Sequence, residues 1–428
     1  MHVKRWIVLL IFGITFVSLG VAYVITNVYR TQPFPEEIYY VTLQFVDRPI
    51  RGALFALCGL ALSAVAIYQL HRSLLSPFMS TDRGSGGLVD SIYQHRLLGK
   101  GPKIVAIGGG HGLSTLLRGL KKHTGNLTAI VTVADDGGSS GRLRREMGVL
   151  PPGDIRMCLV ALADAEPLMK ELFQYRFDKG TGLEGHSFGN LFLAAMNEIT
   201  GNFESALRES SRVLAVRGQI LPSTLEDIQL VAEYEDGQFA HGESAVPLAG
   251  KPISRVSLEP AHPAAHPDAI KAILEAEMII LGPGSLYTSL LPNLLVDDVA
   301  RAIRGASAVK VYVCNVATQH GETDNFAAMD HITAIERHAG ANLFQFVLIN
   351  DNERTIGFIG EDSDPVRATS LPPKGDYQAV FSDVVDIAHP HFHDGDKLAQ
   401  ALLRLFHDRD ASRGAPQSND EPSLVTSR

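Results

Sequence analysis

Residues 104–120 read IVAIGGGHGLSTLLRGL, and this stretch decides the fold. Four apolar residues lead into a glycine-rich segment. Leu113, Leu116, Leu117 and Leu120 then recur at the spacing of one helix face. The pattern predicts a strand that passes through a glycine loop into a helix, which is the opening of an α/β unit.

Several further apolar runs have the same character, and helical patterns separate some of them. Continuous apolar strands are typical of a parallel sheet that is covered on both faces. The sequence therefore predicts a Rossmann-like α/β domain over residues 103–408, with a mostly parallel sheet and helices on both faces. The expected strands lie at residues 103–107, 127–133, 277–281, 308–313 and 344–349.

One segment departs from this alternation. IQLVAEYEDGQFAHGESAV has apolar residues on both sides of Asp236 and Gly237, and Asp-Gly is a strong hairpin signal. We expect a β insertion at about residues 217–260. The insertion could act as a lid or as an oligomer contact, and the sequence does not distinguish the two.

The N-terminal region is expected to contact a membrane. Residues 6–26 and 52–70 are apolar and free of charge, and a bilayer core needs about 20 helical residues. We predict a two-helix transmembrane hairpin over residues 1–75. Basic residues before the first run and after the second place both termini and the main domain in the cytoplasm, with the 27–51 loop outside. The expected location is the inner membrane, as a multi-pass protein.

The remaining ends of the chain are polar. Residues 76–102 are expected to form a linker, and residues 409–428 a disordered tail. The formal net charge of the 428 residues is −9, which argues against a general nucleic-acid-binding protein, because such a protein needs a basic face.

The opening glycine loop is a candidate phosphate site. Gly108, Gly109, Gly110 and Gly112 lie between a strand and a helix, where backbone N–H groups point outward and the helix dipole favours an anion. A tight turn with nothing bound is the alternative. The spacing fails the G-x-G-x-x-G nicotinamide fingerprint, and no lysine is present for a Walker A loop.

A second candidate stretch follows the second expected strand and combines acids, glycines, hydroxyls and arginines. Acids at this position often hold a ribose or a metal. The alternative is a solvated surface turn. The candidates are Asp135, Asp136, Gly137, Gly138, Ser139, Ser140 and Arg142, followed by Asp154 and Arg156 in PPGDIR.

A third loop leaves the strand at 277–281. In an open parallel sheet, ligands bind beyond the carboxyl ends of the strands, so the three loops are expected to share one crevice. The candidates here are Gly282, Pro283, Gly284, Ser285, Tyr287 and Thr288.

Two further stretches provide polar groups. HSFGNL offers His186 and Asn190, and CNVATQHGETD offers Asn315, Thr318 and Gln319, which suit sugar hydroxyls. Buried structural hydrogen bonding is the alternative for the first stretch, and loop capping is the alternative for the second. HPHFHD at 389–394 could hold zinc, but a domain-closing loop explains it equally well, and no metal site is predicted there.

The ordered motifs IGGGHGLSTLLRGL, ADDGGSSGRLR, PPGDIR, HSFGNL, LGPGSLYTSLLPNLL and NVATQHGETD together resemble the YvcK/CofD-like family, and more closely its YvcK branch, the gluconeogenesis factors. The resemblance covers residues 103–408. Members of this branch are usually soluble, so the expected membrane hairpin departs from the family pattern.

The resemblance implies a nucleotide-linked ligand. For the YvcK branch it implies UDP-sugar binding, such as UDP-N-acetylglucosamine, and a link to carbon metabolism, cell shape and cell-wall synthesis. Gly108–Gly112 and Gly282–Ser285 would then face the phosphates, and Asn190 and Asn315 would line the same crevice. The CofD branch implies instead phospholactyl transfer from a guanosine-linked donor to a deazaflavin, with Mg²⁺ near Asp135 and Asp136.

The sequence is compatible with three functions. The first is a regulatory UDP-sugar-binding protein that is not an enzyme, and we expect it to be a homo-oligomer. The second is a transferase of the CofD type, although no general base and no aromatic platform for a deazaflavin are evident. The third is a nicotinamide-dependent oxidoreductase, against which the failed fingerprint counts.

Overall fold

The computed structural model describes residues 98–165, 167–352, 363–368 and 377–414, together with scattered residues between 12 and 65. The chain divides into two compact units, Met1–Ser91 and Ile92–Arg428. The second unit holds the whole sheet and the candidate site.

The predicted transmembrane hairpin is corrected by the structure. A membrane span needs about 20 consecutive apolar residues in a helix. Among the described residues, no helix is both long and apolar enough to cross a membrane. The helix α15 (Gly395–Gly414) has 20 residues but carries charged side chains along its length. The prediction of a multi-pass inner-membrane protein is therefore wrong. Much of residues 6–26 and 52–70, and of the expected linker and tail, lies outside the described residues.

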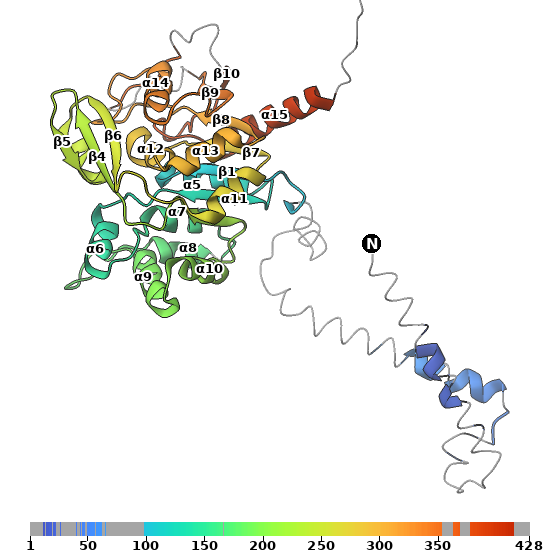
Figure 1. Cartoon of the computed structure of the whole chain (residues 1–428). Helices are drawn as coiled ribbons and strands as arrows, with labels where there is room; N and C mark the ends of the chain where they lie inside the picture. The colour runs from blue at the N-terminus through green and yellow to red at the C-terminus, as the bar shows by residue number, and fades with distance from the viewer. Residues whose placement is uncertain are drawn as a thin grey trace, which may run out of the picture. The chain divides into compact units, whose positions relative to one another are not determined.

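The second unit is built on a seven-stranded sheet in which every neighbouring pair is parallel, in the order β10-β9-β8-β7-β1-β2-β3 (Figure 1). The predicted Rossmann-like α/β class is confirmed. The strands are β1 (Ile104–Gly108), β2 (Leu127–Val131), β3 (Gln219–Pro222), β7 (Met278–Leu281), β8 (Val309–Val313), β9 (Phe346–Asn350) and β10 (Gln378–Ser382).

The strand order reverses between β1 and β7. From β1 the chain proceeds to β2 and β3 on one side, and from β7 it proceeds to β8, β9 and β10 on the other. Loops that leave neighbouring strands at such a point diverge to opposite faces and open a crevice at the carboxyl ends. The topology alone therefore places a ligand site beyond β1 and β7.

Helices cover both faces of the sheet. On one face α5 packs against α7 and α15, and on the other α11 packs against α13 (Figure 1). The helices before α15 are α5 (Gly110–Leu120), α6 (Gly138–Met147), α7 (Gly153–Leu162), α8 (Pro167–Gln174), α9 (Phe188–Thr200), α10 (Phe203–Val213), α11 (Pro267–Glu275), α12 (Leu291–Leu294), α13 (Asp297–Gly305) and α14 (Ala328–Ala339).

The core lies between the sheet and these helices. Every residue of β1, β7, β8 and β9 is buried. The leucines of α5 at positions 113, 116, 117 and 120 are fully buried as well, as their helical spacing predicts. This core fixes the carboxyl ends of the central strands, and with them the loops of the candidate site.

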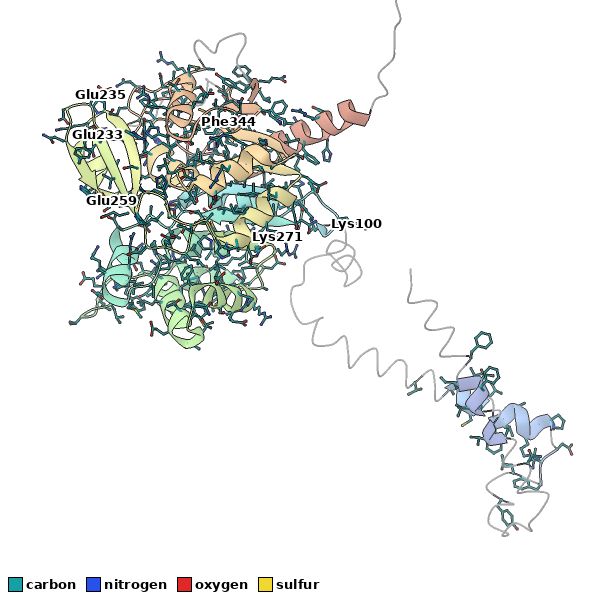
Figure 2. The ribbon with its side chains drawn as sticks, in the orientation of Figure 1. Lys100, Glu233, Glu235, Glu259, Lys271 and Phe344 are labelled. Carbon is teal, nitrogen blue, oxygen red and sulfur yellow. The ribbon has the colours of Figure 1, made fainter. Side chains whose placement is uncertain are left out.

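The insertion forms a separate three-stranded antiparallel sheet of β4 (Gln229–Tyr234), β5 (Phe239–His241) and β6 (Ile253–Glu259), in the order β5-β4-β6. The expected turn at Asp236–Gly237 lies between β4 and β5. The expected start at residue 217 is too early, because β3 belongs to the large sheet. Glu233 and Glu259 lie on this small sheet, and Glu235 lies in the turn that follows β4 (Figure 2).

Candidate functional site

A cavity of about 570 Å³ lies at the carboxyl ends of β1, β7 and β8. The loops after these three strands form most of it, and the loop after β2, the start of α7, the insertion and the segment before α15 complete it. The lining residues are Gly109, Gly110, His111, Gly112, Thr115, Thr132, Asp135, Asp154, Met157, Glu243, Pro283, Gly284, Ser285, Thr288, Ser289, Asn315, Val316, Ala317, Thr318, Gln319, His320, Ser363, His391, Phe392 and His393.

The loop after β1 presents the N-terminus of α5 to the cavity. The N-cap residue Gly109 provides no side-chain cap, and Asp154 accepts only the first N–H, that of Gly110, so the following N–H groups of the first turn remain for other acceptors. Gly110 has a φ of +61°, a left-handed conformation that favours glycine. A Cβ on Gly112 would lie 2.6 Å from the Pro283 carbonyl oxygen. Glycine at position 112 therefore lets the loops after β1 and β7 pack together.

The loop after β7 leads into η4 (Leu286–Leu290), a one-turn π-helix of a kind often found at functional sites. Its Thr288 and Ser289 line the cavity. The buried Asn293 amide donates to the carbonyl oxygen of Gly108 at 3.0 Å and to that of Ser289 at 2.8 Å. These bonds hold η4 against the end of β1.

The loop after β8 is joined to the loop after β7 by a side-chain network. The Ser285 hydroxyl donates to Gln319 Oε1 at 2.6 Å, and Gln319 Nε2 donates to Glu322 Oε1 at 2.8 Å. Thr288 Oγ1 also donates to this oxygen, at 2.9 Å. Asn315 Nδ2 donates to the Gly284 carbonyl oxygen at 3.0 Å. Burial raises the pKa of Glu322 to about 7. The network fixes the positions of two cavity walls.

Carboxyl groups form the opposite wall. Asp154, in the first turn of α7, accepts a hydrogen bond from the Gly110 N–H, and burial, followed by the charge of Asp135, raises its pKa to about 7. Glu243 belongs to η2 (Glu243–Ala245) of the insertion. Burial, with Asp135 as the next cause, raises the pKa of Glu243 to about 8. Near neutral pH Glu243 is largely protonated and Asp154 is partly protonated, and each can donate a hydrogen bond in its protonated form.

The two consecutive acids after β2 have different environments. Asp135 lines the cavity, accepts from the Gly137 N–H at 2.9 Å, and has a pKa raised by burial. Asp136 does not line the cavity, and its Oδ1 accepts from the Ser244 N–H of the insertion at 2.9 Å. Asp136 therefore ties the insertion to the body. In the described part of the chain, no group of three or more His, Cys, Asp or Glu side chains is arranged to hold a metal.

A second polar network adjoins the cavity. Ser139 Oγ lies 2.9 Å from His186 Nδ1, and Asn190 Nδ2 donates to Ser139 Oγ at 3.1 Å. Arg156 Nε donates to Asn190 Oδ1 at 2.9 Å. Ser140 connects this network to the cavity, because its side chain bonds Asp135 and lies 3.4 Å from Asn190 Nδ2.

The structure thus brings about half of the predicted site residues into one cavity. These are Gly109, Gly110, Gly112, Asp135, Asp154, Pro283, Gly284, Ser285, Thr288, Asn315, Thr318 and Gln319. The others lie behind its walls, in the adjoining network or elsewhere, and are not among the lining residues: Gly108, Asp136, Gly137, Gly138, Ser139, Ser140, Arg142, Arg156, His186, Asn190, Gly282 and Tyr287.

Several lining residues were not predicted. Glu243 is contributed by the insertion, and no local pattern marks it. His391 and His393 come from HPHFHD, so this motif reaches the site even though it forms no metal cluster among the described residues. Burial lowers the pKa of His393 to about 4, and its Nε2 lies 3.2 Å from the Cys314 carbonyl oxygen. His393 is therefore neutral and donates a structural hydrogen bond.

The comparisons with known proteins agree with this architecture. The family model of 2-phospho-L-lactate transferase CofD matches residues 104–374. A Nostoc sp. protein is 50% identical over 420 residues, which cover 95% of this chain and 91% of that protein. The gluconeogenesis factor of Bacillus subtilis is 54% identical over 256 residues, covering 60% of this chain and 81% of that protein.

A crystal structure of a Bacillus halodurans protein is also similar, with a TM-score of 0.66 and 44% identity, and the match covers 71% of this chain and 100% of that one. The segment that the family model matches, residues 104–374, contains β1, β7 and β8 and the three loops that form most of the cavity. The chain belongs to the YvcK/CofD-like family, among relatives that include gluconeogenesis factors.

Proposed function

We propose that the cavity binds the diphosphate of a nucleotide-linked sugar such as UDP-N-acetylglucosamine, and that the chain is a regulatory protein of the gluconeogenesis-factor type. Its role would link carbon metabolism to cell shape and cell-wall synthesis. The observation that carries the proposal is the meeting of the loops after β1, β7 and β8 in one cavity, where the strand order reverses.

The backbone of two loops suits a diphosphate. The first turn of α5, beyond the Gly110 N–H that Asp154 accepts, offers N–H groups and the positive end of a helix dipole. The loop from Gly282 to Ser285 lies beside it, and its two glycines, Gly282 and Gly284, leave the backbone without side chains there. The cavity volume of about 570 Å³ is within the range of small-molecule sites, roughly 300–1,000 Å³.

The side chains of the rim suit a sugar. Asn315, Thr318 and Gln319 provide uncharged donors and acceptors for hydroxyl groups. The protonated carboxyl groups of Asp154 and Glu243 can donate to phosphate or sugar oxygens without repelling the phosphates. A polyanion can therefore be accommodated beside an acidic wall near neutral pH.

Two matched glycine variants test this proposal. Gly110 and Gly237 have φ values of +61° and +78°, and an added Cβ meets nothing closer than 3.9 Å at Gly110 and nothing within 4 Å at Gly237. Gly110→Ala and Gly237→Ala therefore introduce similar backbone strain, of about 1 kcal/mol. Only the first places a methyl group beside the loop that would hold the phosphates.

Isothermal titration of the full chain with UDP-N-acetylglucosamine should give binding that Gly110→Ala weakens at least about tenfold and Gly237→Ala leaves unchanged. At 100 times Kd the ligand should add about 2.7 kcal/mol to the free energy of unfolding. The proposal is refuted if titration of the native chain gives no heat of binding and the ligand leaves its free energy of unfolding unchanged.

The family model favours a second candidate, a transferase of the CofD type. Asp135 is the acid that could contribute to a Mg²⁺ site, since Mg²⁺ is often held by one or two carboxylates and by substrate phosphates. Mg²⁺ would supply charge stabilisation for the transferred group. Phospholactyl transfer to a deazaflavin by the native chain, lost in Asp135→Asn, would favour this candidate over the regulatory one.

A further inference from the structure

Three arginines converge on one short segment outside the cavity. Arg142 Nη2 donates to the carbonyl oxygen of Glu184 at 2.7 Å, and Arg176 Nη1 donates to that of Gly185 at 2.5 Å. Because these carbonyl groups are consecutive, the two guanidinium groups flank the same turn. Arg156, on α7, reaches the next part of the chain through Asn190. The three side chains come from α6, α7 and the segment after α8.

Their positive charges are not neutralised by ion pairs. Among the described residues, none of the three lies within ion-pairing distance of an acidic side chain, whereas the nearby Arg144 and Arg217 pair with Asp227 and Asp164. Burial lowers the pKa of Arg156, and the charge of Arg176 is the next cause, ahead of any acid. The cluster therefore has no direct ion-pair partner among the described residues, and Asp154 and Asp135 act on Arg156 only as smaller effects.

Neutral donors complete the same region. Ser139 Oγ accepts from Asn190 Nδ2 and lies 2.9 Å from His186 Nδ1. Burial, and next the charge of Arg142, lowers the pKa of His186, with a smaller opposing effect of Glu146. A neutral imidazole has one N–H donor and one acceptor nitrogen. Ser139, His186 and Asn190 thus place uncharged polar groups beside the arginines.

We propose that Arg142, Arg156 and Arg176 form an oxyanion subsite that binds a phosphate group. The planar guanidinium fork matches phosphate oxygens, and three cations suit a dianion better than the single charge of a carboxylate. The subsite is contiguous with the cavity through Asn190, Ser140 and Asp135. The phosphate is a group of the cavity ligand or belongs to a separate phosphorylated metabolite.

Titration of the full chain with inorganic phosphate at low ionic strength tests the subsite. Arg142→Gln and Arg176→Gln should each weaken phosphate binding at least about tenfold, because each removes a charge-assisted donor. Arg145→Gln is the matched control, since Arg145 is an exposed residue of the same helix α6 and forms no part of the cluster. It should leave phosphate binding unchanged. Circular dichroism should show that Arg176→Gln, at an exposed position, keeps the native fold.

The inference is wrong if the native chain binds no phosphate. It is also wrong if Arg142→Gln and Arg176→Gln bind phosphate as tightly as the control Arg145→Gln. Repeating the titration with saturating UDP-N-acetylglucosamine separates the two sources. Simultaneous binding identifies a separate metabolite, and mutual exclusion identifies a group of the cavity ligand. Because nucleotide-sugar binding is measured independently, its failure would not be confused with failure of the subsite.

Discussion

Replacing Asp154 by Asn should stabilise the protein, and the effect should depend on pH. The carboxyl group lies in the first turn of α7 and accepts from the Gly110 N–H. Asn has the same shape and keeps an oxygen for this bond. The variant therefore removes the cost of ionising a carboxyl group beside Asp135 without removing the contact.

The magnitude follows from the pKa of Asp154, which rises from 3.8 to about 7 in the folded chain. At about 1.36 kcal/mol per pH unit this corresponds to about 4 kcal/mol, and the partial exposure of the side chain reduces the expected effect to about 2 kcal/mol. Between pH 3.8 and about 7, Asp154 keeps its proton in the folded state and loses it in the unfolded state. The native chain therefore loses stability as the pH rises through this window.

Urea denaturation of the full chain at pH 4.5, 6 and 8 measures this effect. The advantage of Asp154→Asn should be small at pH 4.5, grow with pH and level off above about pH 7. As a control, Asp268→Asn in the exposed first turn of α11 should change the free energy of unfolding by less than about 0.5 kcal/mol. A variant no more stable than the native chain at pH 8 would refute the reasoning about the acidic wall.

Three further predictions concern the same cavity. Gly112→Ala should lower the free energy of unfolding by about 1–3 kcal/mol in denaturation experiments, because its Cβ would lie 2.6 Å from the Pro283 carbonyl oxygen. Nucleotide-sugar affinity measured by titration should fall as the pH rises through about 8, where Glu243 ionises, and Glu243→Gln should flatten this dependence. Asn293→Ala should cost about 1–3 kcal/mol in thermal unfolding, because it leaves the buried carbonyl group of Gly108 without this donor.

The central fold was predictable because burial on both faces leaves a strong signal. β1 and β7 are continuous apolar runs, β8 is interrupted only by Lys310, and the spacing of the leucines in α5 marks one helix face. β3 and β10 were not predicted. They are the two edge strands. The residues of β10 are all exposed or half-buried, whereas β3 is a four-residue strand that begins at the exposed Gln219 and ends at Pro222. Edge strands need less continuous apolar sequence, so their pattern is weaker.

The candidate site was predictable only in part, for a similar reason. The loops after β1, β7 and β8 follow recognisable strands, so the rule for parallel sheets brings them together. Glu243 could not be predicted, because its place in the cavity depends on how the insertion packs on the body. The local sequence of Asp136 is that of a ligand-binding residue. In the structure its carboxylate instead accepts a hydrogen bond from the Ser244 N–H of the insertion.

Hydrogen exchange of the full chain, with and without UDP-N-acetylglucosamine, tests the central claim most directly. If backbone N–H groups of both loops hold the diphosphate, exchange should slow together in peptides covering residues 108–116 and 282–289, while the β4–β5 turn at Asp236–Gly237 stays unchanged. Protection of only one loop, or protection confined to other parts of the chain, would contradict the account.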